Sequence, residues 1–366
     1  IEPAVSGYPR YTEAARYWLQ WAGIPDSIYS KNAGKNDYTD DFQSRGSWVN
    51  YLAGGSSVIP GKKGLGIPLD MAFAFHTDAG VTKNDSIIGT LGICTVSNSD
   101  GKTTFENGYS RWTSRDLTDV IQTQIVSDVR KTFAPEWTRR GLWNKSYSEA
   151  RVPEVPTMLL ELLSHQNFAD MRYGLDPRFR FTVSRAIYKG MLKYLSYNSG
   201  EPYVVQPLPV SQFSAKFVAK NKVELRWSPV VDSLESTAKA EQYVVYTRMD
   251  DGGFNNGIVT KNTRIVMEIQ VGKIYSFKIT ALNRGGESFP SEILSVCRVN
   301  NDRPEVLVIN GFDRLSAPAS FLQNHTLAGF KNDDDPGVSY VSDYAFVGKQ
   351  YEFMRSKQWV SDDDAG

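Results

Sequence analysis

Two residues of this sequence place a reactive side chain in or directly after an apolar run. His76 follows the run Met71 to Phe75, and Glu161 interrupts the run around Met158 to Leu160. Continuous apolar runs bounded by proline and glycine are typical of buried central strands in an α/β sheet, where ligands gather at the carboxyl ends of strands. A carboxylate in such a run is costly unless it is paired, bound to a metal or used in chemistry. His76 is therefore either a hydrogen-bonded structural residue or a participant in the chemistry.

The composition limits the class of protein. A chain of 366 residues is long enough for two to three domains. Its 41 basic and 41 acidic side chains give a net charge of zero, which argues against a nucleic-acid or anionic-membrane partner. Two cysteines, Cys94 and Cys297, exclude a disulfide framework and a cysteine-based zinc site. We expect no transmembrane segment, because no run of about 20 apolar residues occurs.

Residues 1–200 are predicted to form an α/β domain. Residues 32–41 are rich in Asn, Asp and Gly and predict a loop. Apolar positions at helical spacing predict helices over residues 12–22, 44–52, 117–129 and 178–195, and apolar or β-branched runs predict strands over 71–75, 86–95 and 158–160.

Residues 201–302 change to the alternating pattern of β-strands. Trp227 followed by Pro229, the strand Y-V-V-Y from Tyr243, and G-K-I-Y-S-F-K-I-T-A-L-N-R-G-G from Gly272 carry this pattern. Together they resemble a fibronectin type III domain, a family that implies a β-sandwich used as a spacer or an interaction surface.

Residues 303–366 are predicted to open a further α/β domain. Pro304 to Asn310 reads as a strand with Asp313 near its carboxyl end, and residues 344–357 read as a helix.

Four blocks of the first domain resemble the zinc-dependent N-acetylmuramoyl-L-alanine amidases of the amidase-3 type. A-F-H-T-D-A around His76 is similar to that family's S-I-H-A-N-A strand end, and Arg45 and Asn50 match its R-x-x-x-A-N helix. Arg140 to Leu142 resembles a short R-G-V segment, and Val155 to Asp170 resembles the block V-P-A-V-L-V-E-L-G-F-L-S-N-P-E-D. The order and spacing of the blocks agree with the family.

The resemblance implies a function and roles for residues. His76 would be a ligand of a catalytic Zn²⁺, and Glu161 would be the catalytic glutamate, a general base and then an acid. Thr77 and Asp78 would support the site or contact substrate, as would Arg45 and Asn50. The bond cut would be the amide between muramic acid and L-Ala in peptidoglycan, and the protein would be secreted, periplasmic or at the cell surface.

One family block is missing from this sequence, which leaves alternatives open. The family's first zinc ligand lies in a G-H-G-G turn that does not occur here, so the other zinc ligands are expected outside this segment. The chain also resembles Bacteroidetes amidase-like proteins that are named xanthan lyases and carry a golvesin-like β-domain. The alternatives are a non-catalytic cell-surface protein that binds glycans or acts in adhesion, and a polysaccharide-processing protein, although no lyase-type arrangement is identified.

Overall fold

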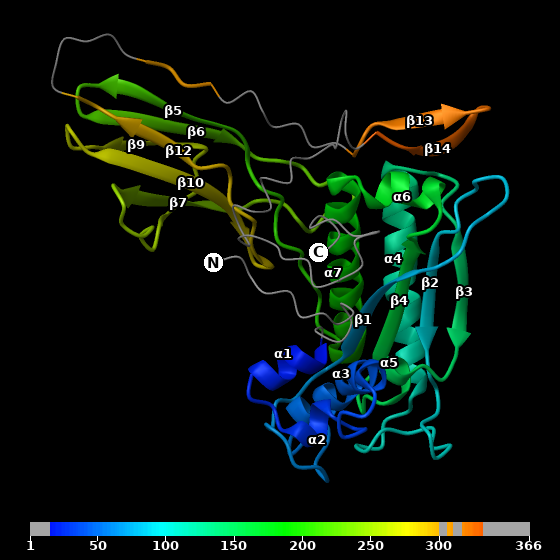
Figure 1. Cartoon of the computed structure of the whole chain (residues 1–366). Coiled ribbons are helices and arrows are strands. Elements are labelled where there is room, and N and C mark those ends of the chain that lie inside the picture. The colour runs from blue at the N-terminus through cyan, green and yellow to red at the C-terminus, as the bar shows by residue number, and fades with distance from the viewer. Residues whose placement is uncertain (1–14, 300–305, 310–316, 332–366) are drawn as a thin grey trace. The chain divides into compact units, whose positions relative to one another are not determined.

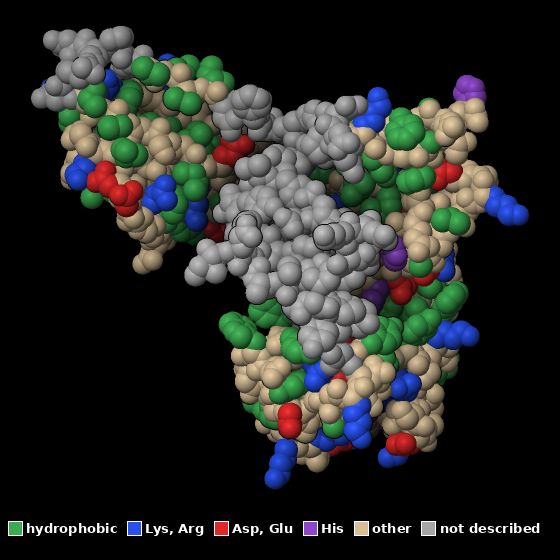
Figure 2. Space-filling model, viewed as in Figure 1, with side chains coloured by type: hydrophobic (Ala, Val, Ile, Leu, Met, Phe, Trp, Pro, Cys, Tyr) green, Lys and Arg blue, Asp and Glu red, His purple; other side chains and the backbone are tan. Residues whose placement is uncertain are grey.

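The structure is a computed structural model that describes residues 15–299, 306–309 and 317–331 (Figure 1). These residues form two compact units. One unit contains residues 15–195 and 317–331, and the other contains residues 196–299 and 306–309. Acidic and basic side chains are interspersed on the visible face, as expected from a net charge of zero (Figure 2).

A four-stranded mixed sheet organises the first unit. The strands are β1 (Ala72–Asp78), β4 (Thr157–Ser164), β2 (Thr90–Cys94) and β3 (Arg139–Asn144), in the order β1-β4-β2-β3. β1 runs parallel to β4 and β2 runs parallel to β3, whereas β2 and β4 are antiparallel. β4 is the central apolar strand, with seven of its eight residues buried and only Glu161 half-buried.

Helices cover both faces of this sheet. The large core on one face joins β4 to α4 (Trp112–Thr132) and α7 (Pro177–Ser199) through residues such as Ile121, Met158 and Val183. A smaller cluster on the other face joins Ala150, Leu159 and Ala74. The remaining helices of this unit are α1 (Ala15–Trp21), α2 (Asp26–Tyr29), α3 (Asp37–Ala53), α5 (Ser148–Arg151) and α6 (Phe168–Gly174).

A buried ion pair joins α4 to α7. Lys189 Nζ lies 2.6 Å from Asp128 Oδ2, and the side chains are 1% and 2% exposed. Gln124 donates a hydrogen bond of 2.9 Å to Asp128 and accepts one of 2.6 Å from Lys193. Burial removes water from these charges, so each depends on its partners in the protein.

The second unit is a β-sandwich. Its core contains Trp227 from one sheet and Tyr243, Phe277 and Ile279 from the other, because inward apolar side chains alternate with outward polar ones. One sheet has the order β5 (Ser211–Ala219), β6 (Lys222–Ser228), β9 (Arg264–Glu268); the other contains β7 (Gln242–Met249), β8 (Ile258–Thr260), β10 (Ile274–Asn283), β11 (Gly286–Glu287) and β12 (Leu294–Cys297).

The segment predicted to open a third domain is described only in part. Residues 306–309, within the predicted strand, form no strand and are 79–86% exposed. β13 (Ser320–Gln323) and β14 (Thr326–Phe330) form an antiparallel hairpin that contacts α6 of the first unit, with the Phe330 ring 6.0 Å from the Phe168 ring. Asp313 and the helix predicted over 344–357 lie outside the described residues.

Two expectations about the first unit are wrong. The sequence predicts β1 at the centre of the sheet, but among the described strands it lies at the edge, with Phe75 52% exposed. Its apolar run alternates alanine with phenylalanine, and small residues satisfy a half-covered face as readily as a buried one. The loop expected over residues 32–41 ends early, because Asn36 caps α3 by accepting a hydrogen bond from Thr39 N–H.

Both cysteines are free; Cys94 is buried and Cys297 is exposed. Among the described residues, no helix has the length and apolarity needed to cross a membrane.

The buried ion pair generates a stability prediction. Lys189→Met leaves the Asp128 carboxylate without its cation and should lower the free energy of unfolding by about 3–5 kcal/mol. Lys189→Met combined with Asp128→Leu removes both charges and should recover most of that loss. Urea unfolding followed by tryptophan fluorescence measures both variants, with the exposed Lys131→Met as the control. Equal losses in the single and double variants would show that the charge is not the cause.

Candidate active site

His76 and Glu161 lie side by side on neighbouring strands. They are register partners in the parallel pair β1–β4, and residues directly opposite each other on parallel strands project to the same face of the sheet. Ala74 and Leu159, two residues before each of them, pack in the small cluster on that face. A bulge follows His76 and shifts the register before Asp78. Bulges are frequent beside active sites, where they redirect side chains.

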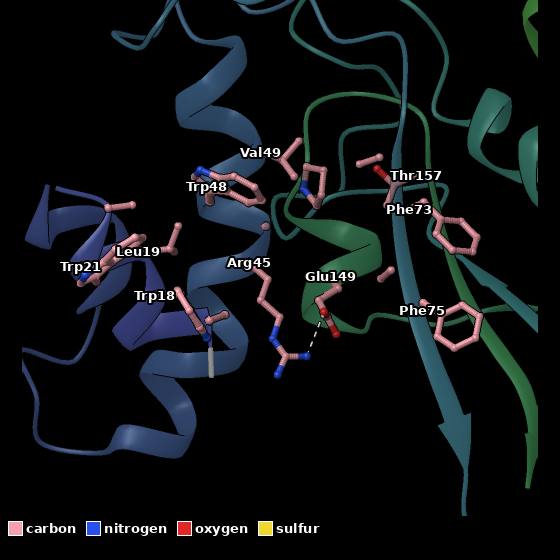
Figure 3. A pocket seen from close by; sticks show the side chains of 16 residues that line it. Trp18, Leu19, Trp21, Arg45, Trp48, Val49, Phe73, Phe75, Glu149 and Thr157 are labelled. Carbon is pink, nitrogen blue, oxygen red and sulfur yellow. Dashed lines mark hydrogen bonds and ion pairs between the residues drawn. The ribbon is translucent and has the colours of Figure 1, made fainter. Parts of the chain in front are cut away.

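Glu149 joins this pair from the start of α5. Its Oε2 accepts a hydrogen bond of 2.8 Å from His76 Nε2. Its Oε1 accepts one of 3.1 Å from Arg45 (Figure 3). Arg45 also donates a 2.7 Å hydrogen bond to Asp41, whose side chain is 2% exposed. A chain of alternating charges therefore runs from α3 through α5 to β1.

The neighbours of these groups shift their pKa values. The hydrogen bond to Glu149 raises the pKa of His76, against the effect of burial. Burial acts to raise the pKa of Glu149, but the hydrogen bonds and charges of His76 and Arg45 outweigh it and hold the pKa below its ordinary value. Each partner therefore favours the charged form of the other.

Glu161 has a different environment from Glu149. Burial raises its pKa above the ordinary value, Asp78 adds to that rise, and His76 opposes it. Its Oε2 atom is buried and has no hydrogen-bond partner among the described residues. A half-buried carboxyl with a raised pKa and an unused acceptor is suited to exchange protons with a bound water or substrate.

Other predicted site residues have structural partners. Asp78 forms a 2.6 Å ion pair with Arg140, whose cation also acts on Glu161. Thr77 Oγ1 lies 3.1 Å from His165 Nδ1 at an exposed position.

Asn50 binds the chain segment that follows α5 and does not bind His76 itself. Its amide donates to the Val152 carbonyl and accepts from the Glu154 N–H, both at 2.8 Å. The side chain therefore fixes the turn between α5 and β4, and so supports Glu149 and Glu161 indirectly.

Glu149 is the site residue that the sequence analysis missed. It lies in a four-residue helix, which is too short to show periodicity, and its partner His76 is 73 positions away. The available signal was an acidic residue in a first helical turn, shortly before the apolar strand that carries Glu161.

The residues at this site fit a zinc ion only in part. His76 and Glu149 supply nitrogen and oxygen donors of the types that zinc binds, and they lie 2.8 Å apart. A catalytic zinc uses three protein ligands and a water. In the described ranges, no group of three or more His, Cys, Asp or Glu could hold a metal ion. These residues alone therefore do not complete a zinc site.

The fold and the site define a multidomain protein with a mixed α/β unit and a β-sandwich unit. Residues 208–296 match the Fibronectin type III domain family, which confirms the prediction for the second unit. No curated protein matches the chain.

Solved structures match a quarter or more of the chain. The Twitchin kinase region from C. elegans shares 24% identity over 27% of this chain and 18% of that chain, with a TM-score of 0.24. Titin kinase and its flanking domains share 22% identity over 25% of this chain and 16% of that one, with a TM-score of 0.23. The rat CD45 extracellular region, domains d3–d4, shares 14% identity over 25% and 50%, with a TM-score of 0.23. The chain spans less than a fifth of the first two structures.

The paired charges generate a pH prediction for the metal-free protein. Glu149→Gln should lower the pKa of His76, because the neutral amide cannot stabilise the imidazolium. NMR titration of the His76 ring measures this directly. The raised pKa of His76 contributes its full stabilisation below pH 6.5, the ordinary pKa of histidine. The lowered pKa of Glu149 contributes its full stabilisation above pH 4.5, the ordinary pKa of glutamate.

The stability difference between the wild type and Glu149→Gln should therefore be largest between those two values. It should decline as the pH rises through the folded pKa of His76 or falls through that of Glu149. If the His76 titration were unchanged in Glu149→Gln, Glu149 would not be the group that raises the pKa of His76.

Proposed function

We propose that the first unit is an amidase domain that hydrolyses the amide between muramic acid and L-Ala in peptidoglycan. The observation that carries the proposal is the convergence of His76, Glu161 and Glu149 on one face at the β1–β4 pair. The sequence blocks around Arg45, His76 and Glu161 are the reason for choosing this reaction among hydrolytic ones.

Glu161 acts as the proton carrier in this proposal. Its carboxylate takes a proton from the attacking water, and the water oxygen then forms a bond to the amide carbonyl carbon. The same carboxyl group gives the proton to the leaving amine of L-Ala as the carbon–nitrogen bond breaks. Burial raises the pKa of Glu161 above its ordinary value, and a carboxyl group with a raised pKa is a better proton acceptor and donor in these two steps.

Arg45 and Glu149 orient His76. The two ion pairs that begin at Asp41 fix the Glu149 carboxylate, and Glu149 in turn fixes the imidazole ring. Zinc, when bound, would lower the pKa of its water toward ~7. Within this proposal His76 is one ligand, and the ligands that the described residues lack come from elsewhere.

Peptidoglycan as the partner places the protein in the periplasm, outside the cell or at its surface. The fibronectin type III domain would serve there as a spacer or an interaction module. Both statements depend on the amidase assignment.

Glu161→Gln tests the reaction. The amide keeps the shape of the side chain but cannot accept the proton of water, so release of stem peptides from peptidoglycan should fall by about 10²–10⁴-fold. Mass spectrometry of the soluble products, with zinc supplied, measures the release. Exposed Glu136→Gln is the matched control and should retain full activity.

Two outcomes would reject the amidase. One is a wild-type protein that carries its complete amidase segment, contains zinc by elemental analysis and releases no stem peptide. The other is a Glu161→Gln variant as active as the wild type. Retention on insoluble peptidoglycan without cleavage would favour the non-catalytic glycan-binding alternative.

A further inference from the structure

A pocket of about 480 Å³ lies over one face of the sheet in the first unit (Figure 3). Its floor includes Ala72 and Ala74 of β1 and Thr157 of β4, and its walls include residues of α1 and α3. Ala72 and Thr157 are register partners, so their side chains project to the same face. The volume falls within the usual range of pockets that hold small molecules.

This face is also the face of the candidate active site. Along β1, Ala72, Ala74 and His76 alternate with two phenylalanines, so these three side chains share one side of the strand. The phenylalanines lie on the other side: Phe73 packs against the large core, and in Figure 3 the rings of Phe73 and Phe75 point away from α1 and α3. The pocket therefore lies directly before His76 along the strand.

Glu149 belongs to both the pocket and the candidate active site. It lines the pocket, and its carboxylate accepts the 2.8 Å hydrogen bond from His76. Neighbouring positions on the same side of a strand are about 7 Å apart, so a group bound over Ala74 lies one such step from His76. One molecule can therefore fill the pocket and present an adjoining bond to the site.

Indole rings form much of the pocket wall opposite β1. Trp18 and Trp21 of α1 are 64% and 80% exposed, and Trp48 of α3 is 40% exposed. Ligand pockets are lined mainly by hydrophobic and aromatic side chains, and aromatic rings pack well against other rings in stacked or edge-to-face arrangements. These tryptophans therefore suit an aromatic or aliphatic group.

The polar groups of the pocket select an uncharged occupant. Arg45 and Glu149 carry the only charges among the described residues that line it, and they pair with each other at 3.1 Å. Asp41 and His76 bind this pair further. Apart from the pair, Thr157 and the tryptophan indoles, the lining side chains carry no polar group. A charged or hydroxyl-rich group would lose its hydrogen bonds to water here without replacement.

The pocket is larger than the apolar groups beside a muramoyl–L-Ala amide. Those groups are the methyl of the lactyl unit on one side and the methyl of L-Ala on the other. Either methyl would leave most of the 480 Å³ unfilled. A bulkier apolar group would bury more surface against the tryptophans and bind more tightly.

We propose that this pocket binds an aromatic or large aliphatic group bonded directly to the amide that the neighbouring site hydrolyses. The substrate class then includes N-acyl amino acid amides with a bulky apolar acyl group. The inference rests on the proposed function, because the reaction is the same. Water adds to the carbonyl carbon, the carbon–nitrogen bond breaks with proton transfer to the nitrogen, and a carboxylic acid and an amine are released.

Titration calorimetry on the full chain tests the binding site, with Glu161→Gln present so that no ligand is consumed. The probe is N-(2-naphthoyl)-L-alaninamide, and N-acetyl-L-alaninamide is the same amide without the bulky group. The naphthoyl compound should bind about tenfold more tightly, because it buries more apolar surface. Ala72→Leu fills the floor of the pocket and Trp48→Ala removes part of a wall, so each should weaken naphthoyl binding about tenfold. The control Trp112→Ala removes an exposed tryptophan outside the pocket and should have no effect.

Equal binding of the two compounds, or naphthoyl binding that neither Ala72→Leu nor Trp48→Ala weakens, would overturn the proposal. Chromatography of released 2-naphthoic acid tests the substrate class, with zinc supplied to the protein that carries its complete amidase segment. Release that is lost in Glu161→Gln supports the proposal, whereas release of stem peptides without naphthoic acid overturns it. If neither substrate is cleaved but the naphthoyl compound still binds, the proposed function and the substrate class are both rejected and only the binding site stands.

Discussion

The Glu149 carboxylate connects three elements that are distant in the sequence. It binds His76 on β1 through one oxygen and Arg45 on α3 through the other, while it projects from α5. Without Glu149, the His76 imidazole and the Arg45 guanidinium would lie close together with like charge. The arrangement of the site therefore depends on one negative charge between two positive ones, and Asp41 balances the far side of Arg45.

This dependence explains how two carboxyl groups near one histidine acquire different properties. Glu149 is held ionised by two cations, whereas Glu161 has an unused buried oxygen and a raised pKa. Environments that separate the pKa values of neighbouring carboxyl groups allow one to orient and the other to exchange protons. The residue types alone do not distinguish these roles; their neighbours do.

Sequence patterns predicted the elements with strong periodicity and failed where structure depends on distant contacts. The helix α4 follows from the helical spacing of apolar residues around Ile121, and the strand β4 follows from the apolar run that begins at Met158. Both patterns are local properties of the sequence. The fibronectin type III sandwich followed from alternation and a long motif, and the family match confirms it. The edge position of β1 depends on which strands pair, and the role of Glu149 depends on a contact across 73 residues. Neither feature produces a periodic pattern in the sequence.

The Asn50 side chain gives the site a chemical vulnerability. Its amide holds the turn between α5 and β4 by giving one hydrogen bond and receiving another. Deamidation to aspartate would keep the acceptor for Glu154 N–H but would replace the donor to the Val152 carbonyl with a second oxygen. Two acceptors would then face each other, and the turn would be pushed away from α3. Deamidation of Asn50 alone would thus loosen the positions of Glu149 and Glu161 together, although neither residue is altered.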